Sequence, residues 1–275
     1  MSPNPGPYTF TGTCGYIVGN GRVAVIDPGP DDPEHIAALA NALRGETIDH
    51  IVVTHTHRDH SPGARRLKAL TGAKIVGCAR HAPNDRPGLG RVDSSHDLEH
   101  VPDLEMRDGD TLSCDGFSLT AIHTPGHASN HLCFALPEEN ALFSGDHVMA
   151  WSTSVIAPPD GVMNDYIASL EKLRARSESV YWPGHGGPAR DPQRYVRALI
   201  SHRRLREAAI LGAIGRGDHS VASISARVYE GLDSRLAPAA ALSVLAHLED
   251  LVARGRARAD GPVGFAARYE LAEAE

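Results

Sequence analysis

Residues 54–60 read THTHRDH and place three histidines and one aspartate within six positions. The apolar residues 51–53 precede this stretch and predict a short buried strand. Ser61, Pro62 and Gly63 follow it and predict the start of a helix, with Ser61 as the N-cap and Pro62 at the first helical position. We therefore expect the polar groups on a turn at the C-terminal end of a strand, where binding sites form in open α/β structures.

The residue types in this turn are those that bind metal ions. Imidazole and carboxylate groups are standard ligands of Zn²⁺ and similar ions. His55 and His57 are two residues apart, so in an extended turn their rings can point the same way, while Asp59 and His60 can face a second position. One turn can thus serve two ions. The alternative is a polar surface loop with chance histidines, because the chain contains 16 histidines.

Three further turns offer ligands in matching contexts. His127, Asp146 and His185 each follow a short apolar segment that predicts a strand, and each lies in a turn that contains glycine. The turns read TPGH, SGD and WPGHG. We expect the four strand ends to converge on one point.

The order HxHxDH followed by these three residues resembles the metallo-β-lactamase superfamily of dinuclear metal hydrolases, over residues from about 10 to 190. The resemblance implies two divalent metal ions, Zn²⁺ first and Fe or Mn as alternatives. The implied ligands are His55, His57 and His127 for the first ion, Asp59, His60 and His185 for the second, and Asp146 as the bridge between them. β-Lactamases of the superfamily usually have cysteine in place of a bridging aspartate, so Asp146 argues against antibiotic hydrolysis as the main role.

The order of the predicted elements fits an α/β fold. The predicted strands are 8–18, 22–27, 51–53, 73–77, 110–114, 117–123, 131–136, 140–143 and 179–181, and the predicted helices are 31–44, 62–70 and 164–176. This order fits two sheets packed face to face with helices outside. By resemblance it is the four-layer αββα sandwich, which we assign to a catalytic domain of residues 1–190.

Residues 191–275 predict a second, smaller domain. Its predicted helices are 191–212, 220–229 and 237–254, and a hairpin follows over 255–271. Three helices and a hairpin form a winged-helix-like pattern, which is common in DNA-binding proteins. We favour a packing domain instead, because the last helix carries Glu249 and Asp250 beside few basic residues. On the stretches GDHVMAWS and HRRLRE, the chain is similar to the beta-lactamase-like protein 2 branch, whose members resemble endoribonucleases and acyl-carrier thioesterases.

Composition and charge limit the kinds of substrate and partner that the protein is expected to bind. The net charge is −7, and it is uneven: residues 190–275 carry 13 Arg against 11 acidic residues, and the rest of the chain is strongly acidic. An acidic catalytic domain weakens, without excluding, an RNA substrate. Neither a membrane span nor a signal peptide is expected, and the four cysteines read as reduced thiols, so we expect a cytoplasmic protein. The sequence does not indicate the oligomeric state.

Two loops and one helix complete the expected site. Residues 80–106 form a candidate lid, whose His81, His96 and His100 are expected to be exposed. Residues 151–161 are expected to line the pocket, with Trp151 either packing or binding substrate. In the long helix, His202 is the candidate proton donor to the leaving group, or a surface histidine.

Charged residues raise two further expectations. Arg203 or Arg206 either bind an anionic substrate or pair with Glu207 or with carboxylates of the first domain. Asp27 lies in the turn after the second predicted strand. By resemblance it supports the metal site, although a plain turn aspartate is an equal alternative.

Three functions remain open from sequence. The first is a hydrolase that uses a metal-bridging hydroxide, oriented by Asp59 and Asp146, on an ester, thioester or phosphodiester bond of a small-molecule or acyl substrate. The second is a metal-dependent endoribonuclease acting on single-stranded RNA. The third is a metal-binding sensor or binding module without turnover. A complete ligand set with an open coordination position argues against the third, because structural zinc sites are closed.

Overall fold

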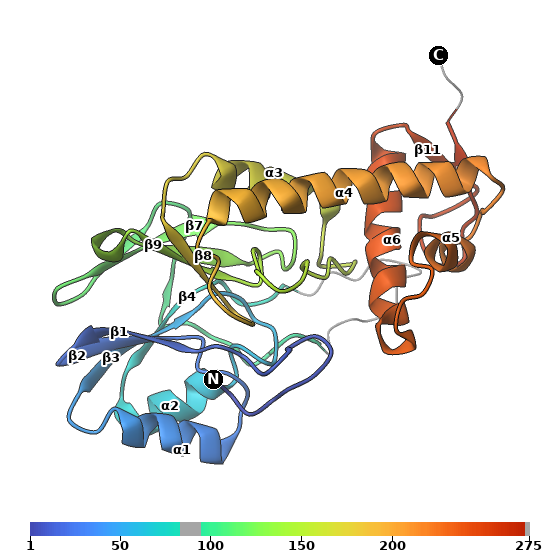
Figure 1. The fold of residues 1–275 in the computed structure, drawn as a ribbon. Coiled ribbons are helices and arrows are strands. Elements are labelled where there is room, and N and C mark those ends of the chain that lie inside the picture. The colour runs from blue at the N-terminus through green and yellow to red at the C-terminus, as the bar shows by residue number, and fades with distance from the viewer. Residues whose placement is uncertain (83–94, 273–275) are drawn as a thin grey trace.

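The computed structural model describes residues 1–82 and 95–272. Two five-stranded sheets face each other, with helices on their outer sides, so the predicted four-layer sandwich is confirmed (Figure 1). The first sheet contains, in spatial order, β1 (Tyr16–Asn20), β2 (Arg22–Ile26), β3 (Thr47–Val53), β4 (Lys74–Gly77) and β5 (Leu104–Glu105). The second contains β10 (Val180–Pro183), β9 (Ala141–Gly145), β8 (Leu132–Leu136), β7 (Ser118–His123) and β6 (Thr111–Ser113).

The helices cover the outer faces of the sheets. Helices α1 (Pro33–Ala42) and α2 (Gly63–Thr71) lie on the first sheet, and α3 (Met163–Arg174) lies on the second (Figure 1). Strands β2, β3 and β4 pair in parallel, which explains why they are apolar runs rather than alternating patterns. Their side chains, such as Val25 and Ile51, pack with Leu119 and Phe134 of the other sheet in one core.

The C-terminal region forms the predicted winged helix. It contains α5 (Val221–Val228), α6 (Ala237–Ala253), β11 (Ala257–Ala259) and β12 (Tyr269–Leu271), with a short 3₁₀ turn η3 (Ser234–Leu236) before α6. Within the described chain, Ser234–Ala253 is the one helical stretch long and apolar enough to cross a membrane, and 50% of it is buried inside the protein. This burial is that of a core helix.

Helix α4 (Pro192–Gly215) connects the two parts of the molecule (Figure 1). Near its start, Val196 and Leu199 join the core under α3, and near its end Ile210 and Ile214 join the core of the winged helix. The helix therefore holds the second domain against the first, and the predicted division at residue 190 falls just before it.

Three local predictions are wrong. The first strand begins at Tyr16 rather than at residue 8, because the N-terminal segment pairs with the turn after β10 instead: the Cys14 N–H donates to the Gly184 carbonyl over 2.7 Å. Ser61 is not the N-cap of α2; its Oγ donates to the Asp97 carboxylate over 3.0 Å, and Pro62 holds the cap position. The apolar positions of the predicted helix 191–212, which include Leu205, are expected to pack inward, but Leu205 is 70% exposed because α4 bridges two domains there.

Candidate metal centre

All seven predicted ligands lie at one edge of the two sheets. The turn of residues 54–60 follows β3, and the turns that carry His127, Asp146 and His185 follow β7, β9 and β10. Two of these turns require glycine: Gly126 and Gly145 have φ of 132° and 47°. The expected convergence of four strand ends is therefore present, and the donor atoms fall into two groups.

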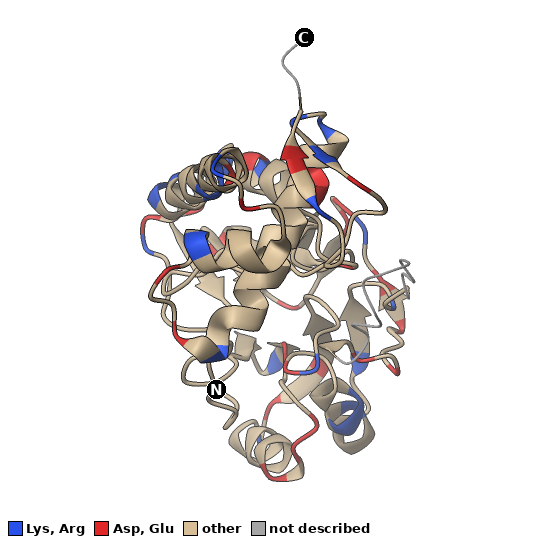
Figure 2. Cartoon of the chain, turned by 90° about the vertical axis from the view of Figure 1, so that its right-hand side faces the viewer, with Lys and Arg blue, Asp and Glu red and all other residues tan. Residues whose placement is uncertain are grey.

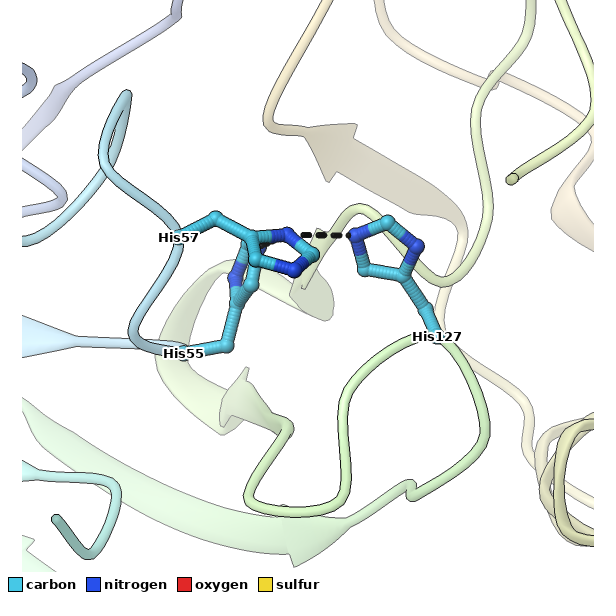
Figure 3. A group of neighbouring side chains, drawn as sticks. All are labelled: His55, His57 and His127. Atoms are coloured by element: carbon cyan, nitrogen blue, oxygen red, sulfur yellow. Dashed lines mark hydrogen bonds between the residues drawn. The ribbon is translucent and has the colours of Figure 1, made fainter. Parts of the chain in front are cut away.

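The first group consists of His55, His57 and His127 (Figure 3). The Nδ1 of His57 lies 3.0 Å from the Nε2 of His55 and 3.0 Å from the Nε2 of His127. Ligand atoms about 2.0–2.1 Å from one tetrahedral zinc ion are roughly 3.3 Å apart. The three nitrogens therefore have nearly the spacing that a single ion requires.

The second group consists of Asp59, His60 and His185. The Oδ2 of Asp59 lies 3.4 Å from the Nε2 of His60 and 3.1 Å from the Nε2 of His185. Asp146 lies between the groups: its carboxylate is 3.4 Å from His60, 3.3 Å from His185 and 3.6 Å from His127. Within the described residues, the buried Nε2 of His60 and Oδ1 of Asp146 have no hydrogen-bond partner. Orphaned donor atoms at this spacing fit bound metal ions.

The outer nitrogens of the ligand histidines are held by the surrounding protein. The Nδ1 of His60 lies 2.9 Å from the Asp27 carboxylate, and that of His127 lies 2.7 Å from the Val155 carbonyl. Asp27 also accepts hydrogen bonds from the N–H and the hydroxyl of Thr54. Such contacts fix the ring orientation and leave Nε2 facing the centre. Asp27 therefore has the supporting position that the resemblance implied.

Asp27→Asn is expected to lower the affinity for metal by about 10- to 100-fold, because the carboxylate that orients His60 is lost. Asparagine tolerates the positive φ of 46° at this position, so the backbone should be retained. Competition with a chromophoric chelator measures the affinity. Asp49→Asn, which breaks only a surface pair with Arg22, is the control. An unchanged affinity would show that Asp27 has no such role.

The two groups differ in proton occupancy. Burial lowers the pKa of His55 and His57 well below its usual range, so these rings are neutral. Burial also opposes charge on His60 and His185, but the carboxylates of Asp59 and Asp146 outweigh it. The pKa of His60 is thereby raised well above its usual range, and that of His185 is raised to about 10. At neutral pH the second group therefore holds protons that a metal ion must displace.

Metal uptake is consequently expected to release roughly two protons at about pH 8, from His60 and His185, and none from His55 or His57. The apparent affinity should rise with pH until His185 loses its proton near its pKa of about 10. Calorimetric titration of the metal-free protein in buffers of different ionisation enthalpy counts the protons. Uptake with no proton release would contradict the assignment of the second group.

The loop histidines depart from expectation. His81, His96 and His100 are only 4%, 3% and 1% exposed, so the prediction of exposed loop histidines is wrong. The rings of His81 and His96 stack at 3.7 Å, and together with Asp160 they form a further group of potential ligands beside His57. The central part of the candidate lid, residues 83–94, lies outside the described residues. Sequence spacing did not connect Asp160 to these histidines, since they are far apart in the chain.

A cavity of about 760 Å³ opens onto the metal ligands. Its walls include residues 151–155 and several further positions of the predicted loop, which confirms that this loop lines the pocket. Trp151 both lines the cavity and stacks on Phe10, with ring centroids 4.8 Å apart. On the far side, the winged helix supplies a mostly apolar wall that includes Leu232, Leu236 and Ala239.

His202 also lines this cavity. Its Nε2 accepts a hydrogen bond from the Nε of Arg206 over 3.2 Å. Burial, together with the charges of Arg203 and Arg206, lowers the pKa of His202 to about 4. The ring is therefore neutral at physiological pH and carries its one proton on Nδ1. Its role as a proton donor stays a prediction.

Comparison with known proteins identifies the family and agrees with the fold. Residues 7–185 match the metallo-beta-lactamase superfamily, and residues 220–264 match the beta-lactamase associated winged helix domain. A beta-lactamase-like protein 2 homolog of Drosophila melanogaster is 31% identical over 93% of this chain and 87% of its own length. A metallo-beta-lactamase family protein of Thermus thermophilus superposes with a TM-score of 0.80, covering 98% of this chain and 96% of that chain at 24% identity.

Other relatives carry the names of enzymes. Thioesterase pkgB of Emericella nidulans is 34% identical over 75% of this chain, and an atrochrysone carboxyl ACP thioesterase of Cryptosporiopsis sp. is 29% identical over 78%. The chain spans 55% and 61% of the lengths of these two proteins. The chain belongs to the metallo-beta-lactamase superfamily. It is a hydrolase of that superfamily with an associated winged-helix domain, and the predicted resemblance is confirmed.

Proposed function

We propose that the protein is a dinuclear metal-dependent hydrolase that cleaves acyl thioesters or closely related esters. The observation that carries the proposal is the meeting of two groups of ligand atoms, joined by Asp146, at the end of a partly apolar cavity. In this proposal the first ion is held by His55, His57 and His127, the second by Asp59, His60 and His185, and Asp146 contacts both.

The donor set suits Zn²⁺ first, and Fe or Mn as alternatives. When bound, two such ions supply an activated water at neutral pH and polarise the carbonyl oxygen of the substrate. The protein contributes orientation. The carboxylates of Asp59 and Asp146 accept hydrogen bonds from the attacking water and hold it in line with the carbonyl, and the loop from Trp151 onward limits how the substrate enters.

Two features favour an acyl substrate over single-stranded RNA. The thioesterase names of the relatives point to acyl chemistry. The wall that the winged helix supplies is mostly apolar, as an acyl arm requires. Among the described residues the arginines that line the cavity are Arg58, Arg203 and Arg206, whereas RNA binding calls for a basic groove that follows the length of a strand. Basic and acidic residues are interspersed along the ribbon on the side of the molecule that Figure 2 shows. The free state of the four cysteines supports the expected cytoplasmic location.

Steady-state hydrolysis by the zinc-loaded protein tests the proposal. Acyl thioesters of several chain lengths are compared with a short single-stranded RNA, and an Asp146→Asn variant accompanies each to exclude contaminating enzymes. Thioester turnover that the variant lacks is the expected result. If the protein instead cleaves RNA, the variant does not, and neither protein hydrolyses the thioesters, the endoribonuclease alternative would replace the proposal.

A further inference from the structure

Arg203 is a buried cation that has no carboxylate partner among residues 1–82 and 95–272. It is 1% exposed and lines the cavity. Its Nη2 donates to the Ser154 carbonyl, and its guanidinium lies 5.1 Å from the centre of the Tyr166 ring. Its Nε has no hydrogen-bond partner, and no carboxylate of the described chain lies within ion-pair distance. An uncompensated buried charge is costly, so such a site favours an anion from outside the chain.

Arg206, one helical turn further along α4, is half-buried and likewise lines the cavity without a carboxylate partner among the described residues. It donates to His202 and to the Val228 carbonyl, and lies 4.6 Å from the centre of the Tyr229 ring. These hydrogen bonds leave N–H donors of its guanidinium unused.

Two other charged residues of α4, which do not line the cavity, do have ion-pair partners. Arg204, on the exposed face, lies 3.4 Å from the Glu171 carboxylate. Glu207, the neighbour that the sequence offered to Arg203 or Arg206, pairs with Arg254 instead. Of the partners that the sequence left open for these arginines, Glu207 is therefore wrong.

Two imidazoles beside the arginines, those of His202 and His247, add no negative charge. The Nδ1 of His202 carries a proton and, within the described residues, has no acceptor. His247 lies close to Arg203, and burial, with the Arg203 charge contributing, lowers its pKa to about 3. Both imidazoles are neutral at physiological pH, so the positive charge of the arginines is neither neutralised nor shared with a carboxylate.

We propose that Arg203, Arg206 and His202 form a subsite for an oxyanion carried by the substrate. The inference rests on the proposed function, because it places this anion on an acyl thioester whose carbonyl reaches the metal ligands through the same cavity. The anion is a carboxylate on the acyl chain or a phosphate on the thiol arm. Guanidinium groups bind both through charge-assisted hydrogen bonds. In this arrangement the winged helix is part of the substrate pocket.

Four thioesters distinguish the two sources of the anion, the acyl chain and the thiol arm. Octanoyl and suberyl groups, which differ by a terminal carboxylate, are each presented on N-acetylcysteamine and on coenzyme A, whose longer arm carries phosphate groups. The zinc-loaded protein is expected to show about a ten-fold or greater preference in kcat/KM for the suberyl group or for the coenzyme A arm. Arg206→Gln should abolish this preference, mainly through KM. Arg204→Gln, an equal change of charge on the exposed face, should retain it.

A binding measurement separates this inference from the proposed function. Calorimetry compares suberate with octanoate, and 4′-phosphopantetheine with pantetheine, on the zinc-loaded protein and both variants. If no thioester is hydrolysed but the anionic probe binds about ten-fold more tightly in an Arg206-dependent way, the thioesterase proposal fails and the subsite stands. If thioesters are hydrolysed with no anion preference, or with one that survives Arg206→Gln, the subsite is overturned. Cleavage of RNA without Arg206-dependent binding of either probe also overturns it.

Discussion

Asp146→Asn is expected to reduce kcat/KM by about a thousand-fold or more and to lower the metal content from two ions to one or fewer. Asp146 is the one predicted ligand whose carboxylate contacts both groups, since it lies within 3.6 Å of His127, His60 and His185. Asparagine has nearly the same shape. The substitution therefore removes the charge and one acceptor oxygen while leaving the volume of the side chain in place.

The prediction is checked by kinetics on the best thioester and by elemental analysis of the purified variant. Asp108→Asn, which removes an exposed carboxylate paired with Lys172, controls for a change of net charge. Thermal unfolding of both metal-free proteins shows whether the variant folds. A folded Asp146→Asn protein with two ions and normal turnover would exclude Asp146 as the bridge.

The parts of the site that sequence could predict are those where one local pattern carries the information. His127, Asp146 and His185 are each preceded by a strand of apolar residues and a turn that contains glycine. Each of these three segments can be recognised without the others. Strands β9 and β10 pair in parallel, and β8 is antiparallel to both β7 and β9, so β7, β9 and β10 run in the same direction and end at the same edge of their sheet. Fold and ligand set follow from patterns of this kind.

The remaining parts depend on contacts between distant segments. His96 meets His57 through a bridge between residues 39 positions apart, and Asp160 approaches His96 from the loop before α3. No local periodicity marks such pairs, so these loop histidines were expected at the surface. No local pattern marks Thr13 either. Its backbone pairs with that of His185, which lies near the other end of the first domain in the sequence.

The burial of Arg203 is a second kind of feature that the sequence does not predict. Arg203 and Arg204 are adjacent and identical in type, yet one is buried against Tyr166 and the other is exposed. Helix α4 determines the difference, because its two ends are fixed in two cores and its rotation about its own axis is thereby fixed. A sequence pattern gives the charge of such a residue, whereas the packing of the helix decides whether it has a partner.

Gly184→Ala is expected to lower kcat/KM by about 100-fold or more although it removes no ligand. A Cβ at this position would lie 2.3 Å from the Oδ1 of Asp146 and 2.6 Å from the Cε1 of His60. The backbone cannot move away, because the Gly184 N–H donates to the Gly145 carbonyl and the Gly184 carbonyl accepts from Cys14. The two ligands must therefore shift, and a displacement of about 1 Å in a reactive centre costs roughly 100-fold.

The loss should fall on the second metal group, since the contacts of the added methyl are to His60 and Asp146. Elemental analysis is expected to find about one ion, and affinity at the first group should be nearly retained. Gly187→Ala is the matched control, because a Cβ there meets nothing within 4 Å. Normal turnover by Gly184→Ala would mean that the reaction does not need His60 and Asp146 in these positions. Equal losses in both alanine variants would place the cause in the flexibility of the loop, because only one of them crowds the ligands.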